Sequence, residues 1–194
     1  MIKEEYIQGT EAWKELRYTK ITASDASVIL GVNPWMTRDN LLKQKLRLFP
    51  ETIINSSMQR GIDLEPIARK RFEQMTGILV VPDVKIHPIN DWMMVSLDGI
   101  SIDEKDIVEI KCTNKKNHEL AKNGIIPGIY YPQVQHQISV CGVDSCHYFS
   151  FDGHDGIIVL VERDDNFINE MIEKEYEFYK EMCELREKGI SEIF

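Results

Sequence analysis

The chain has 194 residues, of which 43% are hydrophobic and 28% are charged, and its formal net charge is −9. This length fits one domain with a substantial core, and the composition excludes a low-complexity or fibrous protein. No apolar run is long enough to span a membrane, and the first residues lack the apolar core of a signal peptide. We therefore expect an intracellular protein that has no membrane partner.

The negative charge is concentrated at the C-terminal end. Residues 1–124 carry 18 acidic and 18 basic side chains, whereas the rest of the chain carries 14 acidic and 5 basic ones. A basic surface on the first two-thirds is compatible with this distribution, so the net charge does not exclude a nucleic-acid partner. The four cysteines form no CxxC pair, which favours reduced thiols over an iron–sulfur cluster.

The N-terminal third of the chain has the pattern of helices. Thr10 is the predicted N-cap of the first helix, and Trp13 is expected on its buried side. Pro66 predicts that the fourth helix begins or bends near Asp63, and Gly77 is its expected end. The four predicted helices cover residues 10–20, 21–31, 39–49 (ended by Pro50) and 58–76.

The hydrophobic period then changes to that of strands, and a polar turn at Asp103–Asp106 predicts a hairpin. The last helix has an apolar stripe with one charged interruption, Glu175. The expected elements are strands 78–87, 92–101 and 106–113, helices 114–124 and 130–142, strands 146–153 and 156–164, and helix 164–188. This order predicts one α/β domain, residues 1–194, with a central mixed sheet: a helical N-terminal region over residues 1–76, the sheet and its helices over 77–163, and an acidic helical end over 164–194.

Two carboxylates lie on neighbouring predicted strands. Asp98 ends one strand, and Glu109 lies in the next, with Lys111 on the same face as Glu109. If the strands pair through the short turn, the two carboxylates converge and form a nest for Mg²⁺, which prefers oxygen ligands. Glu65, on the preceding helix, could reach the same metal or a second one. The simpler alternative is a surface ion pair between Glu109 and Lys111 on an edge strand.

A helical Glu followed by D-x₁₀-E-x-K is the set of groups that metal-dependent phosphodiester hydrolysis needs. SLDG followed by VEIK resembles the PD-(D/E)XK nuclease signature, with Leu97 where proline often stands. Beyond this signature, the chain resembles the lambda-exonuclease/YqaJ viral recombinase family over nearly its whole length. The matching segments are AWKELRYTKITASDASVILGVNPW, RGIDLEPIARKRFEQMTG, SLDG, EIK, YYPQVQHQISVCG and VERDD.

The resemblance implies a restriction-endonuclease-like core and assigns a role to each matching residue. The implied metal ligands are Glu65, Asp98, Glu109 and the Ile110 carbonyl, and Lys111 and Gln133 complete the catalytic set. Arg17, Ser24, Tyr130 and Gln137 are the implied 5′-phosphate and DNA-binding residues. An arginine beside a helix N-terminus is also a physically reasonable anion site. Whether Tyr130 or Tyr131 is the relevant tyrosine stays open.

The resemblance further implies a Mg²⁺-dependent 5′→3′ exonuclease, with Mn²⁺ able to substitute, that degrades linear double-stranded DNA. The product would be a 3′ single-stranded tail for recombination by an annealing partner protein. A ring-shaped homotrimer in the cytoplasm of a bacterial or phage-infected cell is also implied. The alternatives are a PD-(D/E)XK endonuclease of DNA repair or restriction, and a non-catalytic DNA-binding module.

Several of these residues also have ordinary structural interpretations. Arg17 could pair with a nearby glutamate, and Ser24 could be only an N-cap. His136 is expected on the surface or satisfied by hydrogen bonds, because no second His or Cys is spaced to share a metal with it. We expect the tryptophans in the core rather than as base-stacking platforms: Trp13, Trp35 and Trp92.

Overall fold

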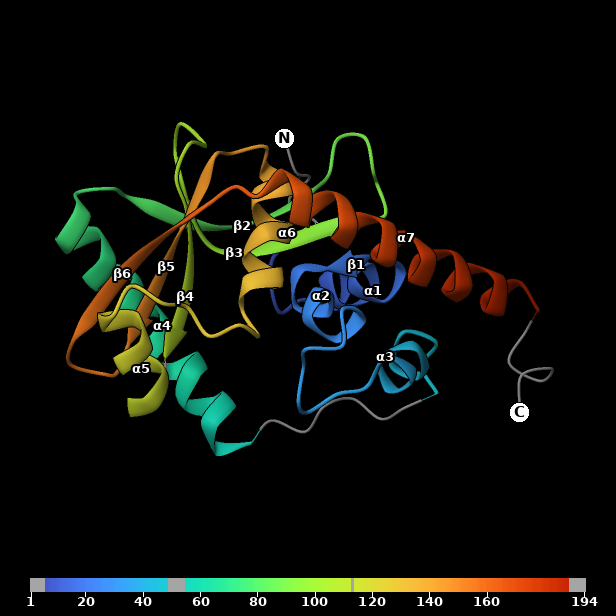
Figure 1. The fold of residues 1–194 in the computed structure, drawn as a ribbon, viewed down its shortest axis with the longest axis horizontal. Helices are drawn as coiled ribbons and strands as arrows, with labels where there is room; N and C mark the ends of the chain where they lie inside the picture. The colour runs from blue at the N-terminus through green and yellow to red at the C-terminus, as the bar shows by residue number, and fades with distance from the viewer. Residues whose placement is uncertain (1–5, 49–54, 113, 189–194) are drawn as a thin grey trace.

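A six-stranded mixed sheet forms the centre of the molecule, and helices lie around it (Figure 1). The structure is a computed structural model, and it describes residues 6–48, 55–112 and 114–188. The elements are α1 (Glu11–Thr19), β1 (Ile21–Thr22), α2 (Ala23–Ile29), α3 (Arg38–Lys45), α4 (Ser56–Thr76), β2 (Val80–Ile86), β3 (Met93–Ser101), β4 (Ile107–Cys112), α5 (Lys115–Lys122), α6 (Tyr131–Cys141), β5 (Ser145–Phe151), β6 (Gly156–Glu162) and α7 (Asp165–Lys188).

The sheet confirms the expected antiparallel meander of β2, β3 and β4. β4 then pairs in parallel with β5, and β5 pairs antiparallel with β6. Because β2 occupies one edge of β3, β1 and β4 share the other edge: β1 lies beside Met93 and Met94, and β4 beside Gly99 and Ile100. Among the described strands none pairs with this edge of β3 between those two contacts, so β3 and β4 diverge there.

The two faces of the sheet are covered by different helices. On one face, Phe72 and Ala68 of α4 pack against Val108 and Phe149 in a small apolar cluster. On the other face, α2, α3, α6 and α7 enclose a larger cluster that includes Tyr148. The alternation of Tyr148 and Phe149 along β5 shows how one strand supplies both cores.

The helix boundaries agree with most of the sequence predictions. Thr10 caps α1 by accepting a hydrogen bond from the Trp13 amide, and Gly77 ends α4 with a φ of 76°. The prediction that the fourth helix begins near Asp63 is wrong, because α4 starts at Ser56 and runs continuously through Pro66. Pro50, the predicted end of the third helix, lies outside the described residues.

The tryptophans differ from one another. Trp92 is buried as expected, whereas Trp35 is 77% exposed in the loop between α2 and α3, so its predicted core position is wrong. None of the residues of α1, all of which the structure describes, is buried, and Trp13 is only half-buried. Within the described ranges, no helix has the length and apolar character that a membrane crossing requires.

Candidate active site

Asp98 and Glu109 lie where β3 and β4 diverge. The last paired residues of the two strands are Gly99 and Val108, immediately next to the two carboxylates. Beyond this point the Ile110 amide has no backbone partner on β3, and it donates instead to Asp98 Oδ2 at 2.7 Å. A Cβ at Gly99 would lie 2.8 Å from the Val108 side chain, so glycine permits the close approach that brings the two strands together beside the site.

The Asp98 carboxyl lies in a region of excess negative charge. Burial raises its pKa well above the usual range, and the neighbouring Glu109 raises it further, with a smaller contribution from Glu65. Lys111 opposes this effect and forms an ion pair with Glu109. Burial lowers the pKa of Lys111, but attraction to Glu109 and Asp98 outweighs burial and raises it overall, so the lysine remains an ammonium group.

Glu109 is fixed by two glutamines of α6. Glu109 is only 1% exposed. Gln133 Nε2 donates to Glu109 Oε1 at 2.6 Å, and Gln137 Nε2 donates to Glu109 Oε2. The two glutamines are four residues apart, so they share one face of the helix. Gln137, grouped by its sequence position with the DNA-binding residues, is fully buried behind the carboxylate.

Glu65 lies on α4 and pairs with Arg69, one helical turn further along. The Arg69 Nε group also donates to the Asp98 carbonyl at 2.7 Å, so this arginine connects α4 to the end of β3. The sequence prediction did not include Arg69, although its i, i+4 spacing from Glu65 was visible.

The oxygen donors at this site fit a hard divalent cation such as Mg²⁺. Asp98 and Glu109 converge, their negative charge exceeds what Lys111 balances, and a bound cation would relieve the rise in the Asp98 pKa. Within the described residues, however, no three His, Cys, Asp or Glu side chains are grouped so that they could hold a metal ion, and Glu65 is paired with Arg69. The role of Glu65 as a metal ligand, which the family resemblance implies, stays a prediction.

A second polar cluster joins the end of α1 to the start of α2. Arg17 Nη2 donates to Ser24 Oγ at 3.3 Å, and the guanidinium lies 4.7 Å from the centre of the Trp13 ring. Thr22 Oγ1 lies 3.0 Å from Ser24 Oγ, and Thr22 itself is buried. Ser24 is exposed. Arg17 is partly exposed, and an accessible arginine beside a hydroxyl group is able to bind an anion.

Residues 12–144 match the YqaJ-like viral recombinase domain, a region that includes both clusters. The chain belongs to this family. Protein YqaJ of Bacillus subtilis is 32% identical over 177 residues, which cover 88% of this chain. The match spans 56% of the Bacillus protein, so the chain corresponds to about half the length of that relative. Protein D345L of African swine fever virus is 26% identical over 43% of the chain and 24% of its own length.

Solved structures of exonucleases share this YqaJ-like fold. The alkaline exonuclease LHK-Exo of Laribacter hongkongensis, in complex with dAMP, is 31% identical, with a TM-score of 0.76 over 89% of this chain and 92% of its own. A phage-related exonuclease from Haemophilus somnus has the same fold at 17% identity, with a TM-score of 0.61 over 90% of this chain and 96% of its own. The predicted fold class, a mixed sheet with a restriction-endonuclease-like core, is therefore confirmed.

The structure distinguishes the two adjacent tyrosines of this YqaJ-like chain. The Lys111 ammonium lies 5.0 Å from the centre of the Tyr130 ring, so Tyr130 adjoins the carboxylate site. Tyr131 points elsewhere: its hydroxyl lies 3.1 Å from Asp164 Oδ2, and its ring packs on Phe167. Tyr130 is thus the tyrosine that the geometry places beside Lys111.

Proposed function

We propose that this YqaJ-like chain is a Mg²⁺-dependent 5′→3′ exonuclease that degrades linear double-stranded DNA and leaves 3′ single-stranded tails. The observation that carries the proposal is the convergence of Asp98 and Glu109, with Lys111 beside them, at the point where β3 and β4 diverge. The family and the alkaline-exonuclease neighbours support a nuclease role.

Each group of the site has a chemical task in this proposal. A Mg²⁺ ion held by Asp98 and Glu109, with Mn²⁺ as a possible substitute, would supply a nucleophilic water and stabilise charge on the phosphate. Lys111, as an ammonium, stabilises the negative charge that develops on the phosphate oxygens. Gln133 and Gln137 hold the Glu109 carboxylate in one orientation, and the backbone amide of Ile110 does the same for Asp98.

The Arg17–Ser24 cluster would bind the 5′-phosphate of the DNA end. An arginine guanidinium forms charge-assisted hydrogen bonds with phosphate, and the exposed Ser24 hydroxyl provides a neutral donor. Tyr130, beside Lys111, would contact the DNA backbone at the scissile phosphate. Exonuclease polarity follows in this proposal from the recognition of the 5′ end.

The family resemblance supports three further elements of the proposal. These are a homotrimer that encloses DNA, a partner protein that anneals the single-stranded product, and a role in recombination. The acidic helix α7 would lie away from DNA, because its carboxylates repel phosphate. The chain corresponds to about half the length of its Bacillus relative. The homotrimer, the annealing partner and the role in recombination are therefore proposed for this chain and not for the whole of that relative.

Substitution at the carboxylate site tests the nuclease proposal. Glu109→Gln and Lys111→Met should each remove most Mg²⁺-dependent degradation of 5′-phosphorylated linear duplex. Glu104→Gln is the matched control, since Glu104 is exposed on the turn between β3 and β4 and pairs with Lys85 at 2.5 Å. DNA binding without degradation by the wild-type protein would favour the non-catalytic alternative, and full activity of Glu109→Gln would refute the proposed site.

A further inference from the structure

Arg17 lies on a helix that has no core of its own. None of the nine residues of α1, all within the described ranges, is buried, and Trp13, Leu16 and Tyr18 are only partly buried. Polar contacts with neighbouring elements therefore contribute to the position of α1 and of the Arg17 guanidinium that it carries.

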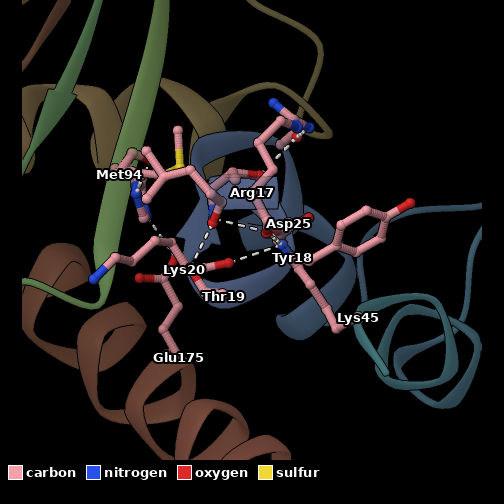
Figure 2. A network of polar contacts seen from close by, with 12 residues as sticks. Arg17, Tyr18, Thr19, Lys20, Asp25, Lys45, Met94 and Glu175 are labelled. Carbon is pink, nitrogen blue, oxygen red and sulfur yellow. Dashed lines mark hydrogen bonds and ion pairs between the residues drawn. The ribbon is translucent and has the colours of Figure 1, made fainter. Parts of the chain in front are cut away.

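One of these contacts comes from a buried ammonium group on α3. Lys45 is 5% exposed, and its Nζ donates to the Arg17 carbonyl and to the Lys20 carbonyl, each at 2.8 Å (Figure 2). These two carbonyls end α1, where the last turn of a helix leaves its acceptors without helical partners. Lys45 thus binds two carbonyls at the C-terminal end of the helix that carries Arg17, and Arg186 donates to a third, that of Tyr18.

The same ammonium also fixes the start of α2. Lys45 Nζ forms an ion pair of 2.6 Å with Asp25 Oδ2, and this oxygen also accepts a hydrogen bond from the Thr22 amide at 2.8 Å. Asp25 directly follows Ser24 in the sequence. The three donor positions of the ammonium are therefore used by the Arg17 carbonyl, the Lys20 carbonyl and the Asp25 carboxylate. These partners belong to the two segments that carry the Arg17 and Ser24 side chains.

From this arrangement we infer that Lys45, with Asp25, is a positioning residue that sets the spacing between Arg17 and Ser24 and so determines the preference for a 5′-phosphorylated DNA end. This inference rests on the proposed function of the Arg17–Ser24 cluster. The outer pair would contact phosphate, and the buried pair would hold the two segments that carry it.

Stability alone does not explain a buried ion pair at this position. Taking a lysine and an aspartate out of water is unfavourable, and an apolar pair of similar volume is often as stable or more stable. Burial lowers the pKa of Lys45, and the nearby cations Arg17 and Arg186 lower it further, although Asp25 opposes them. A charge kept in such surroundings is consistent with a positional role that an apolar residue would not fulfil.

The test measures the affinity of the protein for two short blunt duplexes of one sequence, by fluorescence anisotropy with Ca²⁺ in place of Mg²⁺. One duplex has 5′-phosphate ends, and the other has 5′-hydroxyl ends. The wild-type protein should prefer the phosphorylated end about tenfold or more, given the strength of charge-assisted hydrogen bonds. Arg17→Ala should abolish this preference. Lys45→Met should reduce it to about twofold or less, since the guanidinium is no longer held at its phosphate distance.

If Lys45→Met does not fold, the double variant Asp25→Asn/Lys45→Met takes its place, because it leaves no buried charge unpaired. The double variant should also prefer the phosphorylated duplex about twofold or less. Val161→Ala, a core truncation in β6 at the opposite end of the sheet, controls for lost stability and should keep the preference. Loss of preference in Arg17→Ala with the wild-type preference retained in the Lys45 variants would overturn the inference alone. An unchanged preference in Arg17→Ala would overturn both the phosphate site and the inference, while nuclease activity would still test the proposed catalytic site separately.

Discussion

Gln137 provides a sensitive test of how the carboxylate site is held. Gln137→Leu keeps the side-chain volume but removes the donor to Glu109 Oε2, and both residues are buried. Leaving a buried carboxylate oxygen without this donor should lower the free energy of unfolding by about 1–3 kcal/mol, with about 2–4 °C lost in Tm for each kcal/mol. Loss of such an orienting contact should raise the Mg²⁺ concentration for half-maximal nuclease activity about 10- to 100-fold.

Gln135 is the matched control on the same helix. It is equally buried, but its side chain binds the Glu162 carbonyl at 2.8 Å and the Asp164 amide at 3.0 Å, away from Glu109. Gln135→Leu should therefore show a similar loss of stability in urea unfolding and a wild-type Mg²⁺ requirement. If Gln137→Leu also has a wild-type Mg²⁺ requirement, then Gln137 serves only stability, and the reasoning is refuted.

Three further predictions concern the packing, titration and contacts near the site. Gly99→Ala places a Cβ 2.7 Å from the Val80 side chain and should destabilise the protein by about 1–3 kcal/mol. Adding Val80→Ala should recover some of this loss in a double-mutant cycle, whereas additive effects of the two substitutions would contradict the steric explanation. Burial raises the pKa of Glu175, so the native state binds this proton more tightly than the unfolded state, and the associated stability is lost as pH rises above about 4.5. Glu175→Gln should accordingly gain stability relative to the wild type with increasing pH in urea titrations, whereas parallel curves would argue against a buried titrating carboxyl. Tyr130→Leu should lower kcat about 2- to 30-fold, as expected for a lost cation–π contact with Lys111, whereas Tyr131→Leu should leave kcat unchanged. Equal effects of the two substitutions on kcat would show that the position beside Lys111 is unimportant.

Local sequence signals predicted the elements of the fold well. Thr10, Gly77 and the hairpin turn at Asp103–Asp106 act through hydrogen bonds and backbone conformations of their immediate neighbours, so the sequence contains the necessary information. β1 was missed because its two residues form a strand only through pairing with β3, far away in the sequence. Pro66 misled because its missing amide weakens one bond of a long helix without interrupting it.

Burial of polar residues was the least predictable aspect of the fold. Glu175 interrupts an apolar stripe in the sequence, yet it is fully buried and forms a 2.8 Å contact with His136, whose second nitrogen lies 3.2 Å from the Met94 carbonyl. This contact fits the expectation of a satisfied histidine, but its partner lies on another helix, and helical periodicity does not reveal pairings between helices.

At the candidate site, too, local contacts were predictable from the sequence and contacts between distant elements were not. The proximity of Asp98, Glu109 and Lys111 followed from one hairpin and the alternation of side chains along a strand. The roles of Gln137 and Arg69 depend on how α6 and α4 pack on the sheet, which is a tertiary property. Family resemblance identified the residues around the site, but it did not indicate which of them would bind one another.

Digestion of end-labelled linear and covalently closed circular duplexes of one sequence, with Mg²⁺, tests whether this YqaJ-like chain is an exonuclease that starts at a 5′ end. We predict that the linear 5′-phosphorylated duplex is degraded from its 5′ ends to single strands, that the circle persists, and that Glu109→Gln degrades neither. Cleavage of the circle at a rate comparable to that of the linear duplex would show an endonuclease and contradict the proposed function.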